Sequence, residues 1–149
     1  MTVANSERND PYKNFNFLIE IDGIALAGFS ECTGLRVEVE VIEYREGGDS
    51  SSVRKLPGQS KVSDITLKRG ITDSLDIWNW HKEILAGQIQ SNRKQVIIVV
   101  QDEAGSDKAR FVVTEAWPTK YDPSDLNGKG NEVMIELLEF ANEGIERVK

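Results

Sequence analysis

The stretch RVEVEVIEYREGGDSSSVRKLPG, residues 36–58, decides how this chain folds. Its first half alternates valine with glutamate up to residue 41, which is typical of a β-strand buried on one face and wet on the other. From Ile42 onward the apolar residues take the other parity, and a segment rich in glycine and serine follows. The pattern predicts a strand that changes faces and continues into an extended arm at about residues 46–57.

A strand with apolar residues on both parities needs cover on both sides. Monomeric sheet proteins normally blunt their free edges, whereas this segment lengthens one. We therefore expect the change of parity to mark the point where the strand leaves its own core, so that the arm completes its packing on a neighbouring copy. The alternative interpretation is a surface hairpin with a β-bulge.

The rest of the chain predicts an antiparallel sheet. Alternating apolar residues over 15–21 lead into Asp22-Gly23, a strong hairpin signal, and residues 24–33 are expected to return as a strand. Leu56-Pro57-Gly58 is expected to end the arm, because proline cannot donate to a ladder. Further strands are predicted over residues 61–68, 96–100, 111–113 and 132–140. Short links favour about six or seven antiparallel strands, packed as a sandwich or closed as a barrel.

One segment, about residues 73–86, has helical rather than strand spacing. Asp73 is placed to cap its N-terminus and Gly87 to end it. Its apolar side chains fall on one broad face: Leu75, Ile77, Trp78, His81, Ile84 and Leu85. The helix is expected to cover an open side of the sheet, which gives a mainly β (α+β) fold class.

Length and charge indicate one acidic domain. The 149 residues are 39% hydrophobic and carry a formal net charge of -7. We expect a flexible leader over 1–13 and a single domain over 14–149. The negative surface disfavours specific nucleic-acid binding. The start resembles no secretory signal and no apolar run reaches the ~20 residues of a membrane span, so cytoplasmic synthesis without direct membrane insertion is expected.

No motif predicts catalysis, a cofactor or a metal. The single histidine, His81, lies on the apolar side of the predicted helix, which favours a core or helix-surface role over general-base catalysis. The single cysteine, Cys32, excludes an internal disulfide and is expected to be a buried small hydrophobe. Residues 125–136 approach a calcium loop, but Lys129 stands where an oxygen ligand belongs.

Stretches spread over nearly all of the chain after residue 14 resemble one known family. They are FNFLIEIDG (15–23), GFSECTGL (28–35), VIEYREGG (41–48), KLPG (55–58), ITLKRG (65–70), VVQDEAG (99–105), AWPTKYDPSDLNGKGNEV (116–133) and IELLEFANEG (135–144). In this order and spacing they resemble the inner tube protein of contractile phage tails and of phage-tail-like contractile injection systems, including extracellular toxin-delivery particles.

The resemblance implies a small antiparallel β-barrel flanked by one helix, assembled into hexameric rings that stack into a rigid tube. Contraction of a surrounding sheath drives the tube through a target envelope, and cargo leaves through its lumen. The implied partners are copies of this chain, the sheath protein, baseplate hub or spike proteins, tube-initiator proteins and passing cargo. No enzymatic step is implied. Assembly in the bacterial cytoplasm and release in an extracellular particle, or in a virion tail, are expected.

By position, the resemblance assigns contacts between subunits and between rings to the arm. These candidates are Glu46, Gly47, Gly48, Asp49, Ser50, Ser51, Ser52, Val53, Arg54, Lys55, Leu56 and Pro57. The segment 122–131 is a weaker interface candidate. Carboxylates that alternate correctly to face the lumen are Glu38, Glu40, Glu132 and Glu136, and an acidic wall would let anionic cargo slide without sticking. Asn142 departs from the histidine expected in the family.

Two alternatives stay open at this point. One is the tail tube of a contractile phage virion that conducts DNA, which neighbouring genes would distinguish from an injection particle. The other, from a different class, is a monomeric β-sheet module whose free edge captures a peptide. Sedimentation over a concentration series separates such a monomer from a tube subunit.

Overall fold

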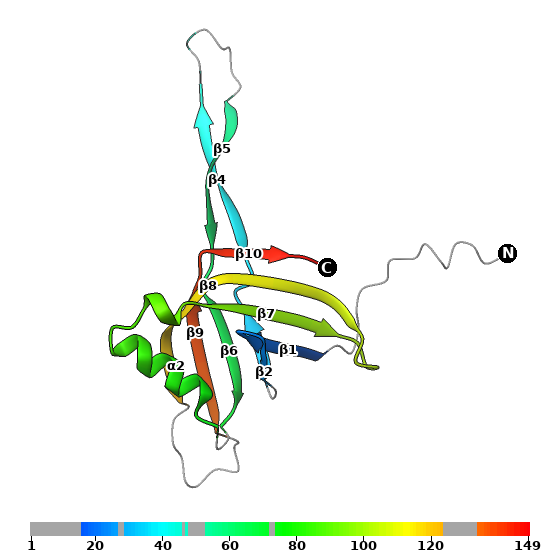
Figure 1. The fold of residues 1–149 in the computed structure, drawn as a ribbon. Coiled ribbons are helices and arrows are strands. Elements are labelled where there is room, and N and C mark those ends of the chain that lie inside the picture. Colours follow the sequence, from blue (N-terminus) through cyan, green and yellow to red (C-terminus); the bar gives the residue numbers. More distant parts are fainter. Residues whose placement is uncertain (1–15, 27–28, 46, 48–52, 72–73, 124–133) are drawn as a thin grey trace, which may run out of the picture.

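The computed structural model describes residues 16–26, 29–45, 47, 53–71, 74–123 and 134–149 of the chain (Figure 1). These residues form ten strands, one α-helix and the 3₁₀ helix η1 (Gln90–Asn92). The strands are β1 (Asn16–Ile21), β2 (Ile24–Leu26), β3 (Phe29–Thr33), β4 (Val37–Tyr44), β5 (Arg54–Val62), β6 (Ile65–Gly70), β7 (Lys94–Gln101), β8 (Asp107–Pro123), β9 (Ile135–Ala141) and β10 (Gly144–Arg147). The mainly β fold with a helix is confirmed, with more strands than expected.

Eight strands form one antiparallel sheet in the order β2-β1-β7-β8-β9-β6-β3, with β10 paired to β8. The other two, β4 and β5, form a separate two-stranded ribbon. Antiparallel pairing is therefore confirmed. Among the described residues no ladder joins β2 to β3, the two ends of the sheet, so the sheet is open and is not the closed barrel that was one expected arrangement.

The long strand β8 belongs to both halves of this sheet. Its first part pairs with β7 on one edge and β10 on the other, and its last part pairs with β9. Between these parts Glu115 adopts a φ of 52°, and the register with β7 shifts between Lys94 and Val96. Figure 1 shows the consequence: β7 and the first part of β8 run across the direction of β6 and β9.

The core lies between the two halves of the sheet and the helix. Residues in β6, and in β9 after the exposed Ile135, alternate between buried and half-buried, as the two-residue period of a strand requires. The strand predicted over residues 96–100 is confirmed in β7, where Val96 and Ile98 are buried on one face and Val99 on the other. The core contains Ile19, Ile21, Ile65, Leu67, Ile77, Trp80, Val96, Ile98, Val113, Ala116, Leu138 and Phe140.

The helix α2 (Asp76–Leu85) packs against β8 and ends as predicted. Gly87 has a φ of 86°, its amide donates to the Ile84 carbonyl, and the next amide donates to the Glu83 carbonyl, which is a Schellman motif. The predicted cap, Asp73, lies outside the described residues. The predicted apolar face was partly wrong, because α2 buries Ile77, Trp80 and Ile84 but leaves Leu75, Trp78 and Leu85 exposed.

Two predicted strands are divided in the structure. Residues 24–33 form β2, which pairs with β1, and β3, which pairs with β6. Residues 61–68 are split after Val62, where β5 ends and β6 begins in another ladder. Two segments of the chain pass very close here, where β4 begins and β5 ends. Gly34 has a φ of 95°, and a Cβ built on it would lie 2.1 Å from the Asp64 carbonyl oxygen.

Candidate assembly surfaces

The β4–β5 ribbon stands away from the rest of the subunit (Figure 1). Every residue of β4 is exposed, and β5 is exposed along nearly all of its length. The prediction of a half-buried strand is therefore wrong for a single subunit, because none of the described residues covers the valines of β4. A surface hairpin with a bulge is present, as the alternative interpretation expected, and the described residues of the subunit leave its apolar side chains exposed.

The ribbon carries two apolar patches on opposite faces. Directly opposed residues of an antiparallel pair share a face, and side chains alternate along each strand. The root patch consists of Val37, Val39 and Val41, which are 55%, 54% and 60% exposed. The tip patch consists of Ile42, Tyr44 and Leu56, which are 48%, 43% and 45% exposed, with Ile42 opposite Leu56. The change of face predicted from the sequence is thus present.

The change of face lies beside a bulge that adjoins Pro57. The register shifts between Val39 and Val41, and Pro57 lies opposite Val41. Proline is tolerated here because each strand of a two-stranded ribbon is an edge strand, and bulges also accommodate it. The expectation that Pro57 ends the arm is therefore wrong, since β5 continues to Val62.

Residues of opposite charge occupy opposed positions near both ends of the ribbon. Glu38 lies opposite Lys61, and Glu43 lies opposite Lys55. Opposite charges in such positions stabilise a ladder by roughly 0.2–1 kcal/mol each. The ladder therefore has a defined register even though it has no core of its own.

The structure describes only some of the residues that the sequence assigned to interfaces. Gly47 and Val53 are exposed, and Arg54, Lys55, Leu56 and Pro57 lie in β5. Glu38 and Glu40 are exposed on β4, on the face opposite the root patch. Outside the described residues are Glu46, Gly48, Asp49, Ser50, Ser51, Ser52, Glu132 and all of 122–131 except Asp122 and Pro123.

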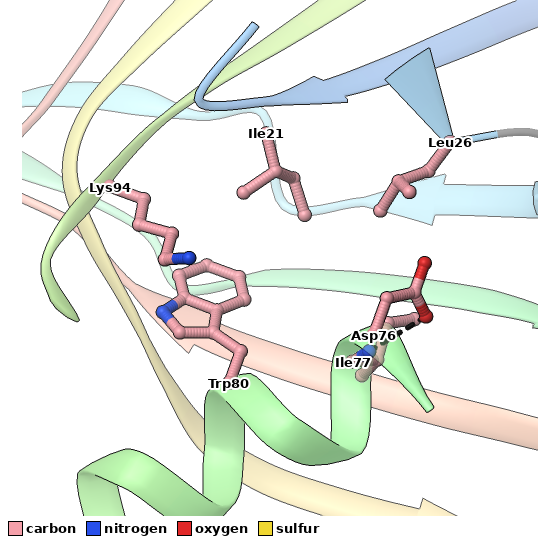
Figure 2. A pocket seen from close by; sticks show the side chains of 6 residues that line it. All are labelled: Ile21, Leu26, Asp76, Ile77, Trp80 and Lys94. Carbon is pink, nitrogen blue, oxygen red and sulfur yellow. Dashed lines mark hydrogen bonds between the residues drawn. The ribbon is translucent and has the colours of Figure 1, made fainter. Parts of the chain in front are cut away.

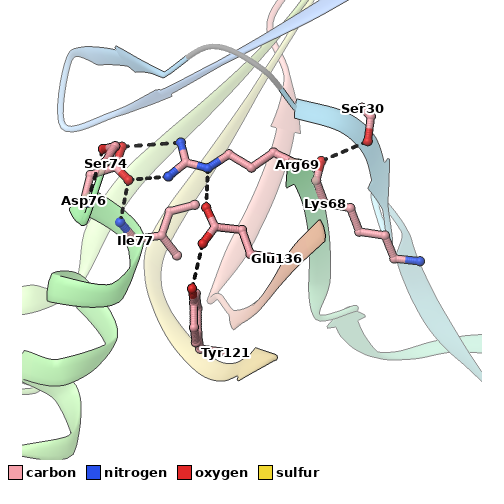
Figure 3. Close-up of polar contacts among 8 residues, drawn as sticks. All are labelled: Ser30, Lys68, Arg69, Ser74, Asp76, Ile77, Tyr121 and Glu136. Carbon is pink, nitrogen blue, oxygen red and sulfur yellow. Dashed lines mark hydrogen bonds and ion pairs between the residues drawn. The ribbon is translucent and has the colours of Figure 1, made fainter. Parts of the chain in front are cut away.

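Glu136 does not face a lumen; it is 5% exposed, so that prediction was wrong. Its Oε1 accepts a hydrogen bond from Arg69 Nε at 2.5 Å, and its Oε2 accepts one from the Tyr121 hydroxyl at 2.7 Å (Figure 3). The physical reason lies in the alternation of β9, because Glu136 shares the core-facing parity of Leu138 and Phe140. Burial of this carboxylate requires the cation beside it.

Arg69 links this buried carboxylate to the start of α2. Its guanidinium also donates to Asp76 in the first helical turn and lies 5.2 Å from the centre of the Phe29 ring. Asp76 in turn accepts a hydrogen bond from the Ile77 amide at 2.7 Å. One side chain thus connects β3, β6, β9 and α2, and sequence analysis missed it because its two carboxylates are distant in the chain or outside any motif.

The surroundings of this cluster shift the pKa values of Asp76 and Tyr121. Burial raises the pKa of Asp76, but the hydrogen bonds from Arg69 and the Ile77 amide, together with the charge of Arg69, outweigh it and hold that pKa below its usual value. Burial, followed by the hydrogen bond to Glu136, raises the pKa of Tyr121 to about 12. Tyr121 therefore remains a hydrogen-bond donor at neutral pH.

Replacing Asp76 with asparagine is expected to remove an acid-sensitive part of the stability. Because the pKa of Asp76 is lower in the folded chain than in the unfolded chain, its contribution is present above the unfolded value and is lost as the pH falls through the folded one. The difference in melting temperature between the wild type and Asp76→Asn should be largest near neutrality and shrink below about pH 4. A difference independent of pH would contradict this role.

A shallow hollow lies between α2 and the β1–β2 hairpin (Figure 2). It is lined by Ile21, Leu26, Asp76, Ile77, Trp80 and Lys94. The Lys94 ammonium lies 5.8 Å from the centre of the Trp80 ring, and Asp76 is held by Arg69. Its charged groups are thus already engaged in structural contacts.

The single histidine packs among aromatic rings. His81 lies beside Trp78 and Tyr121, with ring centres 6.2 and 6.5 Å away. Across the described part of the chain, no group of three or more His, Cys, Asp or Glu side chains could hold a metal ion. None of the described helices is long and apolar enough to cross a membrane.

Comparison with known proteins gives one family match and several similar solved structures. Residues 13–146 match the family model of the T4-like virus tail tube protein gp19. The structure is similar to a chain of the PVC sheath-tube complex, an extracellular contractile injection system, in its extended state (TM-score 0.79, 21% identity, covering 99% of this chain and 97% of that one). It is also similar to a chain of the tube-terminating cap of the anti-feeding prophage (TM-score 0.80, 22% identity, covering 99% and 98%).

A more distant similarity is to Hcp1 from Flavobacterium johnsoniae, with a TM-score of 0.54 and 13% identity, covering 89% of this chain and 94% of that one. At these identities the similarities to solved structures show the shared fold. No curated protein sequence matches the chain.

Proposed function

Since this chain belongs to the T4-like virus tail tube protein family and is thereby a structural subunit of a tube, we propose that it builds the inner tube of a contractile injection system. Hexameric rings stack into a rigid hollow tube, and contraction of a sheath drives this tube through the target envelope with its cargo. The observation that carries the proposal is the β4–β5 ribbon, whose apolar residues are exposed on both faces. Such surfaces mark interaction sites in soluble proteins.

Two copies are needed to cover one ribbon, because the root and tip patches lie on opposite faces. We assign the root patch to a neighbour in the same ring and the tip patch to the next ring. Stacking identical rings head to tail uses different faces of each subunit, a heterologous contact that does not close and therefore grows a filament. The opposite face of the root half carries Glu38 and Glu40, which we assign to the lumen wall, with Glu132 as a further candidate.

The partners follow from this assembly. They are the sheath protein, baseplate hub or spike proteins and tube-initiator proteins, with cargo passing through the lumen. Support comes from solved structures of the same fold, which include a sheath-tube complex, a tube cap and a baseplate. Assembly takes place in the bacterial cytoplasm, and the finished tube leaves in a released particle.

A contractile phage virion is the second candidate, because the matching family is itself that of a virus tail tube. In that case the lumen conducts DNA. Electron micrographs of particles from the source cell separate the two: tubes joined to capsids indicate a virion, and particles without capsids indicate an injection system.

Deleting residues 47–52 tests the role of the ribbon. The shortened chain is expected to fold, because the described strands of the main sheet all lie outside the deleted segment, but it is expected to form no tubes. Circular dichroism checks that the variant folds. Negative-stain microscopy then compares the number of tubes in parallel preparations of the variant and the wild type. Tubes of normal length from the deletion variant would refute the assignment, and a wild type that stays monomeric even with its initiator proteins would favour a peptide-binding module.

A further inference from the structure

We propose that the tip patch of one subunit docks on an apolar cluster at the opposite end of a subunit in the next ring. This end cluster consists of Ile71, Leu75, Met134 and Ile135, which are 37%, 61%, 43% and 39% exposed. The docking rests on the proposed function, because it requires subunits that stack head to tail. It names the surface that receives the ribbon.

The two surfaces lie at opposite ends of the subunit. β5 runs from Arg54 near the tip to Val62 at the root, and β6 then continues from Ile65 to Gly70 after a two-residue link. Gly70 pairs with Ile135 at the start of β9, so the end cluster begins where β6 ends. In Figure 1 the ribbon extends upward, while the end of β6 and the start of β9 lie at the bottom.

The end cluster gathers apolar residues from the end of β6, the start of β9 and the start of α2, with Ile71 and Met134 on one face of the β6–β9 ladder and Ile135 on the other. The Ile71 amide donates to the Met134 carbonyl at 2.9 Å, which extends the β6–β9 ladder beyond Gly70 and Ile135. Leu75 is the residue that precedes the first turn of α2, which Arg69 ties to this ladder through Asp76. Four large apolar side chains are thereby held at one end of the molecule by rigid elements, which favours a specific contact.

Charge also favours a second copy as the occupant. Arg54 lies opposite Tyr44 and therefore on the face of the tip patch. Asp122 is exposed near the end of β8, opposite Leu137, two residues from the start of β9. An apolar patch with a cation at its margin thus faces an apolar cluster with a carboxylate at its margin, and complementary margins fix the register of an interface.

A cysteine pair tests the docking. In a Cys32→Ser background, Leu56→Cys is combined in turn with Met134→Cys, Leu75→Cys and Ile71→Cys, and assembled tubes are oxidised. Because each chain then carries both halves of a head-to-tail contact, at least one pair is expected to give a ladder of crosslinked trimers and longer species in denaturing gels. Single-cysteine variants can give dimers only.

The matched control is Leu56→Cys with Val148→Cys, because Val148 is 50% exposed but bonded to β8 at Arg110, away from the end cluster. It is expected to give no ladder. If the variants form tubes but none of the three test pairs gives more crosslinking than this control, the docking is overturned and the proposed function stays intact. Failure of the wild type to form tubes with its initiator proteins would instead overturn the proposed function.

Discussion

Arg69→Met is expected to lower the free energy of unfolding by about 3–5 kcal/mol, because it leaves a buried carboxylate without its cation. Arg69 is 4% exposed, and its partner Glu136 keeps only the hydrogen bond from Tyr121 once the guanidinium is removed. The variant also loses the link to Asp76 at the start of α2. Denaturant unfolding followed by tryptophan fluorescence measures the change, since Trp80 lies in the core.

The neighbouring residue supplies the control. Lys68 pairs with Glu31 at 3.5 Å, but their side chains are 38% and 49% exposed. Such a surface pair contributes about 0–1 kcal/mol, so Lys68→Met should change the stability little. Equal losses for the two variants would show that burial of the Arg69 pair has no special importance.

Gly34→Ala is expected to cost about 2–5 kcal/mol, from backbone strain and from displacement of a neighbouring chain. The φ of 95° disfavours any residue with a Cβ, and that Cβ would lie 2.1 Å from the Asp64 carbonyl oxygen. Since Gly34 lies just before β4 and Asp64 just before β6, the substitution also shifts the root of the ribbon. Fewer tubes are therefore expected even where the variant folds.

Gly105→Ala is the control that distinguishes the cost of backbone strain from the cost of a steric clash. Gly105 has a φ of 82°, yet a Cβ added there meets nothing within 4 Å. Its substitution should cost only the strain, about 1–2 kcal/mol. Melting temperatures of both variants test this, and a Gly105→Ala loss as large as that of Gly34→Ala would rule out the close passage at Asp64 as the cause.

Local patterns predicted the elements whose partners are near in sequence. The Asp22-Gly23 turn joins β1 and β2 as expected, and Gly87 ends α2. The change of parity after Val41 also survives in the ribbon, because alternation depends only on the strand itself. These features follow from backbone geometry within a few residues.

Features that depend on distant partners could not be predicted. Glu136 was assigned to a lumen because alternation alone does not reveal an arginine 67 residues away. Likewise, helical spacing placed Trp78 rather than Trp80 on the apolar face, since the buried side of α2 depends on contacts such as that of Trp80 with Phe140. The valines of β4 were expected to be buried on one face, but none of the described residues of this subunit covers them.

The course of β8 has a mechanical consequence for the contractile tube that we propose. Because one unbroken strand of 17 residues runs through both halves of the sheet, an axial load passes between them along the covalent backbone. The halves cannot slide apart unless the hydrogen bonds that join β8 to at least one of them break. A loaded tube is therefore expected to yield at the boundaries between subunits before any subunit deforms.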